Sequence, residues 1–438
     1  MKAHQLEFKF HEGSLLEEIC EIDTLRKAFK LVKKNKGAPG IDGITIEKYE
    51  QQLLEELGQL KNEVLGWKYK PTPVKRVEIP KPDGKGVRLL GIPIIKDRVL
   101  HMAIKMVLEP ILDPEFSKSS YGFRPGRNQQ QAVKAAKEYV NTGKEFVVDI
   151  DLSKFFDRIN HDKLISRLGG KIEDKRVLRL IGMILRSGIM AQGTVTVLHE
   201  GSVQGSPLSP LLSNVVLDEL DKELEERNLE FCRFADDCNI FVKTERAAIR
   251  VMGSIKKFIE TKLKLKVNEE KSKVAKAERV KFLGMTIVNG LIAISKKAIN
   301  KAMETVNTLT PRESNLPLER ALEQINIWYK GWASYFKMTQ FPAQLKGIEA
   351  HIRRRLRARF VKQQKRRRNL YRKLIKLGVG KKAVAKAVYS NKGTWNLSHK
   401  SAVEKAYSNN WFAKAGLEIV SNLELDHWLP LNKWVKLV

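Results

Sequence analysis

The 438-residue sequence predicts an α+β fold, with a mixed part over about residues 75–290 and a helical, strongly basic part after it. Three observations support this prediction. Apolar residues make up 42% of the chain, which is enough to build hydrophobic cores in roughly two to three domains. In the mixed part, short apolar runs with the two-residue period of strands alternate with helical patterns. After about Ser295 the period becomes almost wholly helical.

The residues before the mixed part are expected to form two helices. The first spans Glu17 to Lys36, because the following Asn35–Gly40 segment contains two glycines and a proline, which force a turn. The second is expected to open at Ile41–Thr45 and to run through Leu60.

The mixed part begins with a predicted hairpin. Val74–Ile79 alternates apolar and charged residues, and Pro80–Gly84 turns the chain into Val87–Ile92. The other expected strands are Phe146–Ile150, a strand–turn–strand over Phe231–Val242 and a strand pair over Val280–Ile292. The expected helices are Asp97–Leu112, Asp174–Ser187, Leu208–Arg227 and Ala247–Leu263.

The charge of the chain is strongly positive and unevenly distributed. There are 81 Lys and Arg against 50 Asp and Glu, a net charge of +31, of which residues 341–438 hold +18. The densest run, His351 to Arg368, has ten cations and no acid around an apolar stripe of Ile352, Leu356 and Phe360. A solvated face is the ordinary explanation of a charge run, but the single sign favours a helix that follows phosphates. We therefore expect a polyanionic partner, with nucleic acid ahead of a membrane surface.

Several protein classes are not favoured. No stretch approaches the roughly 20 apolar residues that span a bilayer, and polar Met1–Glu12 lacks the apolar region of a signal peptide. Cys20, Cys232 and Cys238 form no CxxC pair, so neither a disulfide framework nor a zinc cluster is expected. The sequence thus predicts a soluble intracellular protein.

Two predicted strand ends carry carboxylates that could perform chemistry. Asp236 and Asp237 occupy a turn between two apolar strands, which is costly unless a cation neutralises them. The strand Phe146–Ile150 contains Asp149 and runs into Asp151. Oxygen ligands from two strand ends suit a pair of Mg²⁺ ions in phosphoryl displacement. Ordinary turn chemistry or a helix N-cap explains either site alone, but both together in one basic chain are harder to explain that way.

At these residues the sequence resembles the reverse transcriptases, or maturases, encoded by group II introns. Phe234–Asp237 resembles the Tyr-Ala-Asp-Asp box of that family, and Asp151 with the following Phe155–Phe156 resembles its first catalytic aspartate and aromatic gate. The resemblance implies that Asp151, Asp236 and Asp237 are catalytic and hold two Mg²⁺ ions, with Mn²⁺ as the alternative metal.

A metal contact from the backbone carbonyl of Leu152 is also implied, and Asp149 is the competing ligand. The resemblance further assigns the incoming dNTP to Lys81, Arg88, Phe156, Gln204 and Lys271. Lys81 and Arg88 lie in the first hairpin, where two cations suit a triphosphate, although a solvated hairpin face is the alternative. Phe156 would exclude a ribose 2′-hydroxyl.

The resemblance also implies a nucleic-acid surface. Phe282–Met285 is similar to the primer grip, and Trp328–Phe336 with the basic helix after it is similar to the thumb. The implied nucleic-acid contacts are Arg124, Arg127, Arg353, Arg354, Arg355, Arg357, Lys365, Arg366 and Arg367.

The implied architecture is a right-hand polymerase with an antiparallel palm sheet, an α-helical thumb and a small basic C-terminal domain. Residues 1–75 would hold an N-terminal extension and the start of the fingers, and 76–293 the fingers and palm. Residues 294–371 would form the thumb and 372–438 the DNA-binding region. No Cys/His cluster follows, as in the compact bacterial class that lacks the endonuclease.

The expected function is RNA-directed DNA polymerisation, with intron-RNA binding in splicing and retrohoming. The expected partners are an RNA template with a DNA or RNA primer, dNTPs, group II intron RNA and target DNA, in the bacterial cytoplasm or nucleoid and without a membrane. A host-adopted enzyme of DNA repair or defence and an RNA-binding splicing factor are the alternatives. Phe234, Val203 and Ser206 depart from the usual Tyr, Pro and Gly, which leaves nucleotide and metal preference open. Monomer and homodimer are both open.

Overall fold

The computed structural model describes residues 15–80, 86–191, 194–196, 200–203 and 205–437. These residues form two compact units. The first contains the described residues up to Ala132 together with Phe146–Val274, and the second contains Val133–Glu145 and the described residues from Ala275 onward. Each unit is described by itself.

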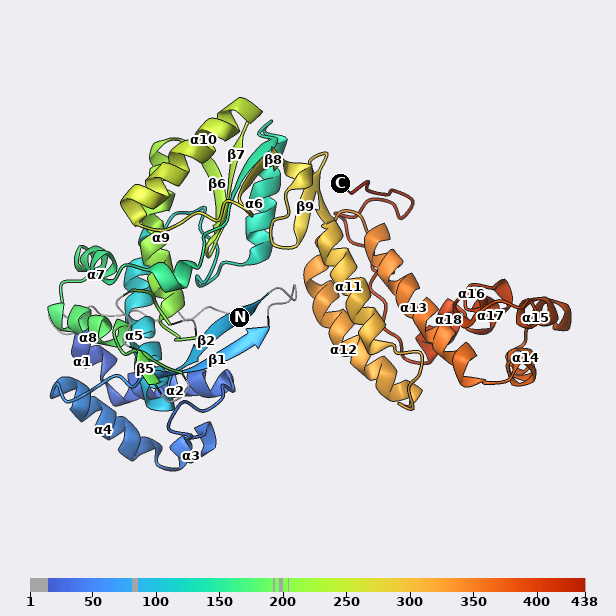
Figure 1. Cartoon of the computed structure of the whole chain (residues 1–438), viewed down its shortest axis with the longest axis horizontal. Coiled ribbons are helices and arrows are strands. Elements are labelled where there is room, and N and C mark those ends of the chain that lie inside the picture. Colours follow the sequence, from blue (N-terminus) through green and yellow to red (C-terminus); the bar gives the residue numbers. More distant parts are fainter. Residues whose placement is uncertain (1–14, 81–85, 192–193, 197–199, 204, 438) are drawn as a thin grey trace. The chain divides into compact units, whose positions relative to one another are not determined.

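The first unit begins with four helices rather than the two expected: α1 (Leu15–Ile19), α2 (Ile22–Lys34), α3 (Ile46–Gln51) and α4 (Leu53–Leu65) (Figure 1). The helix expected to open at Ile41 begins later, because Asp42 accepts a hydrogen bond from the Ile44 amide and forms a local turn. Thr45 then caps α3 by accepting from the Lys48 amide.

The predicted first hairpin is present. Strands β1 (Val74–Pro80) and β2 (Val87–Ile92) pair antiparallel, with Val77 opposite Leu90. The tip that would carry Lys81 lies outside the described residues. Two short strands that we did not predict, β4 (Ile189–Ala191) and β5 (Thr194–Thr196), extend the sheet in the order β2-β1-β4-β5. Helix α5 (Ile95–Leu112) follows the hairpin.

The second sheet of the mixed part has the strand order β6-β7-β3-β8. Its strands are β3 (Phe146–Ile150), β6 (Glu230–Phe234), β7 (Asp237–Val242) and β8 (Lys273–Lys276). Val148, Ile150 and Ile240 of this sheet belong to one buried core. The same core takes in residues of α7 (His161–Gly169), α8 (Lys175–Leu185), α9 (Ser209–Glu226), α10 (Glu245–Phe258) and the π-helix Ile259–Leu263. Helix α7 was not predicted, whereas α8, α9 and α10 were.

The second unit is mainly helical, as expected. It contains most of α6 (Gln129–Asn141), which we did not predict, and the hairpin of β9 (Met285–Val288) with β10 (Leu291–Ile294). Three longer helices follow: α11 (Lys296–Leu309), α12 (Leu318–Phe336) and α13 (Ala343–Gln363). A cluster of short helices completes it: α14 (Arg367–Lys376), α15 (Lys381–Val388), α16 (Thr394–Leu397), α17 (Ser401–Ala406) and α18 (Asn409–Lys414) (Figure 1).

The segment from Ala275 to residue 293, which we expected in the palm, packs with the helical unit instead. Side-chain hydrogen bonds explain this difference. Gln344 of α13 accepts from the Ile294 amide at 2.8 Å and donates to the Ile294 carbonyl at 3.0 Å. Tyr335 of α12 donates to the Leu283 carbonyl at 2.7 Å. The hairpin is therefore fastened to the helices that follow it.

Cys20, Cys232 and Cys238 are buried free thiols. Burial raises the pKa of the Cys20 thiol to about 12, and it raises that of Cys238 well above its ordinary value. Within the described ranges, no helix has the length and apolar character needed to span a membrane.

Candidate active site

The carboxylates predicted to act together lie at one end of the second sheet. Because Phe234 pairs with Asp237, Ala235 and Asp236 are the two residues of the β6–β7 turn. Strand β3 pairs antiparallel with β7, with Ile150 opposite Cys238. The next position in this register sets Asp151 opposite Asp237. The structure thus brings Asp151, Asp236 and Asp237 to the same sheet end.

The charges of these residues are coupled. Burial raises the pKa of Asp236, and the negative charge of Asp151 raises it further. Arg88 and Lys271 act in the opposite direction on the same carboxyl group. Lys271 Nζ also lies 3.7 Å from Asp151 Oδ2. Two of the residues predicted to contact the triphosphate therefore lie close enough to act on the aspartates electrostatically.

The backbone of Asp151 is held from both sides by a loop before β8. Its amide donates to Ser272 Oγ at 3.0 Å, and its carbonyl accepts from the Asn268 amide at 2.8 Å. The neighbouring Leu152 is buried and forms a bridge with Val267. The metal contact proposed for the Leu152 carbonyl stays a prediction.

The three aspartates supply the hard oxygen donors that a divalent ion requires. Burial and the negative charge of Asp151 both raise the pKa of Asp236, and a bound cation would favour its charged form. In the described part of the chain, however, no three His, Cys, Asp or Glu side chains already stand in metal-holding geometry. The competing ligand Asp149 pairs with Asn239, two residues further from the turn than Asp151 and Asp237.

A cavity of about 80 Å³ lies beside Phe156, between β2 and the loop that begins at Gly201. The loop is held to the backbone of Phe156, because the Ser202 amide donates to the Phe156 carbonyl at 2.7 Å. The space is bounded by Arg76, Leu89, Leu90, Gly91, Phe156, Asp157, Ile189, Glu200, Gly201, Ser202 and Val203. Gln204 lies outside the described residues, so its nucleotide contact stays a prediction.

Ser206, which stands where the related family usually has glycine, is used by the fold. Its hydroxyl forms a 2.9 Å hydrogen bond with Nδ1 of His101 on α5. Burial lowers the pKa of His101 to about 3, so the imidazole is neutral at physiological pH. We did not predict this role for His101. A histidine within the otherwise apolar stretch from Val99 to Ile104 was the only signal in the sequence.

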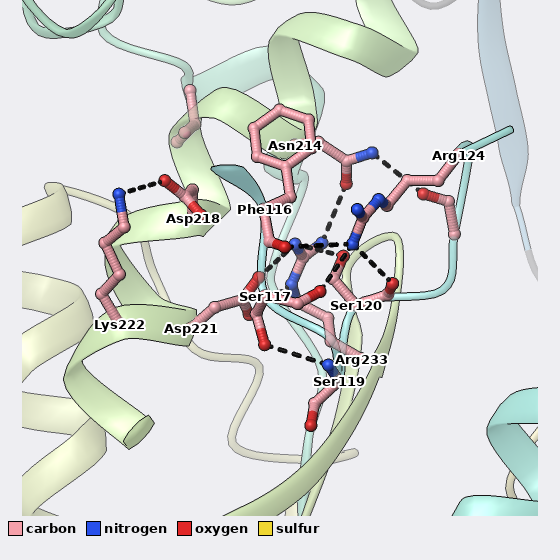
Figure 2. Close-up of polar contacts among 12 residues, drawn as sticks. Phe116, Ser117, Ser119, Ser120, Arg124, Asn214, Asp218, Asp221, Lys222 and Arg233 are labelled. Carbon is pink, nitrogen blue, oxygen red and sulfur yellow. Dashed lines mark hydrogen bonds and ion pairs between the residues drawn. The ribbon is translucent and has the colours of Figure 1, made fainter. Parts of the chain in front are cut away.

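Arg124 does not have the position expected of a phosphate contact, which corrects that prediction. Its side chain is buried and donates to Asp113 Oδ1 at 2.7 Å, and also to the carbonyls of Ser117 and Ser120 at 2.5 and 3.1 Å. Figure 2 shows Arg124 beside this segment. Arg127 is more accessible, although it donates to the Lys118 carbonyl at 2.5 Å.

Arg233 is a buried residue of the site that we did not predict to be functional. It pairs with Asp221 of α9 and contacts Asn214 and Ser120 (Figure 2). A signal was present in the sequence, because an arginine inside the apolar strand before the Asp236–Asp237 turn requires a buried partner. Which acid would provide it could not be inferred from local sequence.

The basic helix α13 divides into buried and accessible cations. Ile352, Leu356 and Phe360 are buried as predicted, but Arg353 and Arg357 are buried as well. Arg357 donates to the Tyr407 carbonyl at 2.9 Å.

The remaining predicted cations differ in their exposure and in the hydrogen bonds that they form within the protein. Arg355 donates to Thr310 Oγ1 at 3.1 Å, and Arg354 is half-buried. Lys365, Arg366 and Arg367 are exposed, although Arg367 donates to two backbone carbonyls. The expectation that all seven predicted cations of this region contact nucleic acid is therefore wrong for the buried Arg353 and Arg357.

Fold and site together define a template-directed polymerase of the right-hand class. The sequence matches the reverse transcriptase (RNA-dependent DNA polymerase) family over residues 79–287 and the group II intron maturase-specific domain over residues 299–377. The chain belongs to the group II intron-like reverse transcriptases and maturases, whose domains bind nucleic acid.

Three similar proteins are described by their identity and coverage. Protein YkfC of Escherichia coli K12 is 32% identical over 300 residues, which cover 59% of this chain and 78% of YkfC. Group II intron-encoded protein LtrA of Lactococcus lactis is 34% identical over 209 residues, which cover 47% of this chain but 34% of LtrA. A chain of a solved partial Cas6-RT-Cas1–Cas2 complex is 26% identical at a TM-score of 0.38, covering 57% of this chain and 43% of that one.

The backbone of Gly122 lies against the β6–β7 turn, and this contact leads to a prediction. A Cβ at Gly122 would stand 2.2 Å from the Ala235 nitrogen, so Gly122→Ala must displace the turn. We expect primer-extension activity to fall roughly 100-fold, because a shift of about 1 Å at reacting groups can cost that much. Gly58→Ala in α4, where a Cβ would meet no atom within 4 Å, is the control and should keep full activity. Equal activity of the two variants would contradict the prediction.

Proposed function

We propose that the chain extends a primer on an RNA template by adding dNTPs at the Asp151–Asp236–Asp237 site. One observation carries the proposal. The antiparallel register of β3, β6 and β7 sets three carboxylates at a single sheet end, and the pKa of Asp236 is raised there by burial and by Asp151. Carboxylates in such an arrangement suit the binding of divalent cations between a primer and a triphosphate.

In this proposal, Asp151, Asp236 and Asp237 hold two Mg²⁺ ions, with Mn²⁺ as the alternative. When bound, the ions would lower the pKa of the primer 3′-hydroxyl and neutralise charge on the leaving oxygens. Arg88 and Lys271 add positive charge for the triphosphate, since both already act on the Asp236 carboxyl group. Phe156 borders the cavity between β2 and the Gly201 loop, where its ring would limit the space at the sugar.

Removing one carboxylate tests the assignment. Asp236→Asn keeps the size of the side chain but removes its charge, so we expect primer extension on RNA to be abolished and RNA affinity to stay within about twofold. The measurement is dNTP incorporation on matched RNA and DNA templates, together with RNA binding by filter retention. Asp149→Asn is the matched control, and it should retain most activity. Full activity of Asp236→Asn would overturn the proposal, and loss of activity only in Asp149→Asn would move the metal site to that residue.

The cavity beside Phe156 leads to a prediction about the sugar. Phe156→Ala enlarges the space without changing a charge, so incorporation of rNTPs relative to dNTPs should rise roughly 10- to 100-fold. Single-nucleotide incorporation with each triphosphate gives the ratio of kcat/KM values. Phe155→Leu changes the neighbouring buried ring and serves as the control. An unchanged ratio in Phe156→Ala would remove the gating role.

A second function, the binding of structured RNA for splicing, is supported by the maturase-specific domain and by the exposed cations that follow α13 and begin α14. In the proposal, Lys365, Arg366 and Arg368 contact RNA phosphates, whereas the buried Arg353 and Arg357 support the helix. Intron RNA is the proposed ligand, and the two functions are separable.

Charge removal at the exposed cations tests this second function. Lys365→Gln, Arg366→Gln and Arg368→Gln in one chain should weaken RNA binding and lower the slope of log K against log salt by about 2, since each phosphate contact adds about 0.7 for a single strand. The matched control carries Arg250→Gln, Lys257→Gln and Lys262→Gln on the exposed side of α10 and the π-helix. If both triple variants change the slope equally, binding follows net charge rather than this surface.

A further inference from the structure

The buried ion pair of Arg233 and Asp221 lies directly behind the catalytic turn. Both side chains are fully excluded from solvent. The guanidinium meets the carboxylate with two bonds, from Nε to Oδ1 at 2.7 Å and from Nη2 to Oδ2 at 2.5 Å. Such bidentate geometry fixes the plane of the guanidinium as well as its position.

The remaining donors of Arg233 reach three other groups. Nη1 donates to Asn214 Oδ1 at 3.1 Å and to the Ala235 carbonyl at 3.0 Å, and Nη2 donates to Ser120 Oγ at 2.7 Å. Each of the five N–H donors of the guanidinium thus has one acceptor. Figure 2 shows Arg233 enclosed by Asp221, Asn214 and Ser120.

The bond to the Ala235 carbonyl connects this network with the metal-binding turn. That carbonyl belongs to the peptide whose nitrogen is the backbone nitrogen of Asp236. Ala235 has a φ of +56°, a left-handed conformation that a residue with a Cβ adopts only at an energetic cost. A charged donor held rigidly against its carbonyl can compensate this cost and orient the peptide that carries Asp236.

The same network also holds the other side of the turn. Asn214, which accepts from Arg233, donates to the Gly122 carbonyl at 2.9 Å. Gly122 in turn packs against the Ala235 backbone. The Arg233 amide donates to the Ser119 carbonyl, and the Tyr121 amide donates to the Arg233 carbonyl. The turn is therefore enclosed by backbone on one side and by the guanidinium on the other.

Stability alone does not call for a buried ion pair at this place. Replacing a buried pair by apolar side chains of similar volume is often neutral or stabilising, because desolvation of two charges is costly. An apolar pair could not donate to the Ala235 carbonyl, however. We infer that Arg233 is a positioning residue: it orients the Ala235–Asp236 peptide and thereby sets the Asp236 carboxylate for a divalent cation. This inference rests on the proposed function of the site.

Manganese binding provides a test that does not depend on turnover. The double variant Asp221→Leu with Arg233→Met replaces the pair by apolar side chains. Binding of Mn²⁺ to the full chain is followed by loss of the free-ion EPR signal, with Asp236→Asn as the reference that lacks the site. We expect the double variant to fold and to bind Mn²⁺ about tenfold more weakly, the effect typical of residues that orient metal ligands.

The matched control removes another buried polar pair of the same unit. Tyr69 donates to Asp97 Oδ1 at 2.7 Å, so Tyr69→Phe with Asp97→Asn also disturbs a buried contact. We expect it to lower the unfolding midpoint and leave the Kd for Mn²⁺ unchanged.

A second readout is primer extension, in which the double variant of Arg233 and Asp221 should lose kcat while the KM for dNTP stays the same. If the double variant does not fold, Arg233→Lys replaces it, because lysine keeps a positive charge beside Asp221 but cannot form the two parallel hydrogen bonds of the guanidinium.

Each result has a defined meaning. Wild-type affinity for Mn²⁺ in a folded Arg233 variant, or equal weakening in the control, would overturn the positioning role. Equal binding by the wild type and Asp236→Asn would overturn it together with the metal site. If the wild type binds Mn²⁺ at this site but extends no primer on RNA, the proposed function fails, while the comparison of Kd values still decides the role of Arg233.

Discussion

Antiparallel pairing of β3 with β7 places Ile150 opposite Cys238, and the position of every acid in the site follows from this register. Because side chains alternate between the two faces of a sheet, a slip of one residue would turn Asp151 away from Asp237. Val148, Ile150 and Ile240 resist that slip, since it would remove them from the core. Burial of these apolar side chains thus keeps Asp151 and Asp237 close together at the end of the sheet, although their negative charges repel each other.

The sequence was sufficient to predict the strands that carry the acids, because each is short, apolar and bounded by turn residues. It was not sufficient to predict which arginines are buried. Arg124 binds Asp113, 11 residues before it, and Arg233 binds Asp221 of another element as well as Ser120, which lies 113 residues away in the sequence. Helices α6 and α7 were not predicted, and the residues that form α1 to α4 were predicted as two helices rather than four.

The uneven distribution of positive charge along the chain can be explained only if the burial of each cation is considered as well. In α13 an apolar stripe was predicted, but Arg353 and Arg357 flank that stripe and are covered too. Arg357 reaches the Tyr407 carbonyl and lies 5.6 Å over the Phe412 ring, so its charge serves the contact between α13 and the short C-terminal helices. Counting cations therefore overstates the surface that remains for phosphates, because the buried Arg353 and Arg357 do not belong to it.

The three buried thiols have a practical consequence for spectroscopy. Reaction with maleimides or methanethiosulfonates requires an accessible thiolate, and burial keeps the pKa of Cys20 and Cys238 well above neutral. A cysteine introduced at an exposed position would therefore be modified selectively by a fluorophore or a nitroxide, with the native cysteines left in place. Site-specific labels could then be attached to either compact unit without substituting Cys238, which directly follows the proposed metal ligand Asp237 in the sequence.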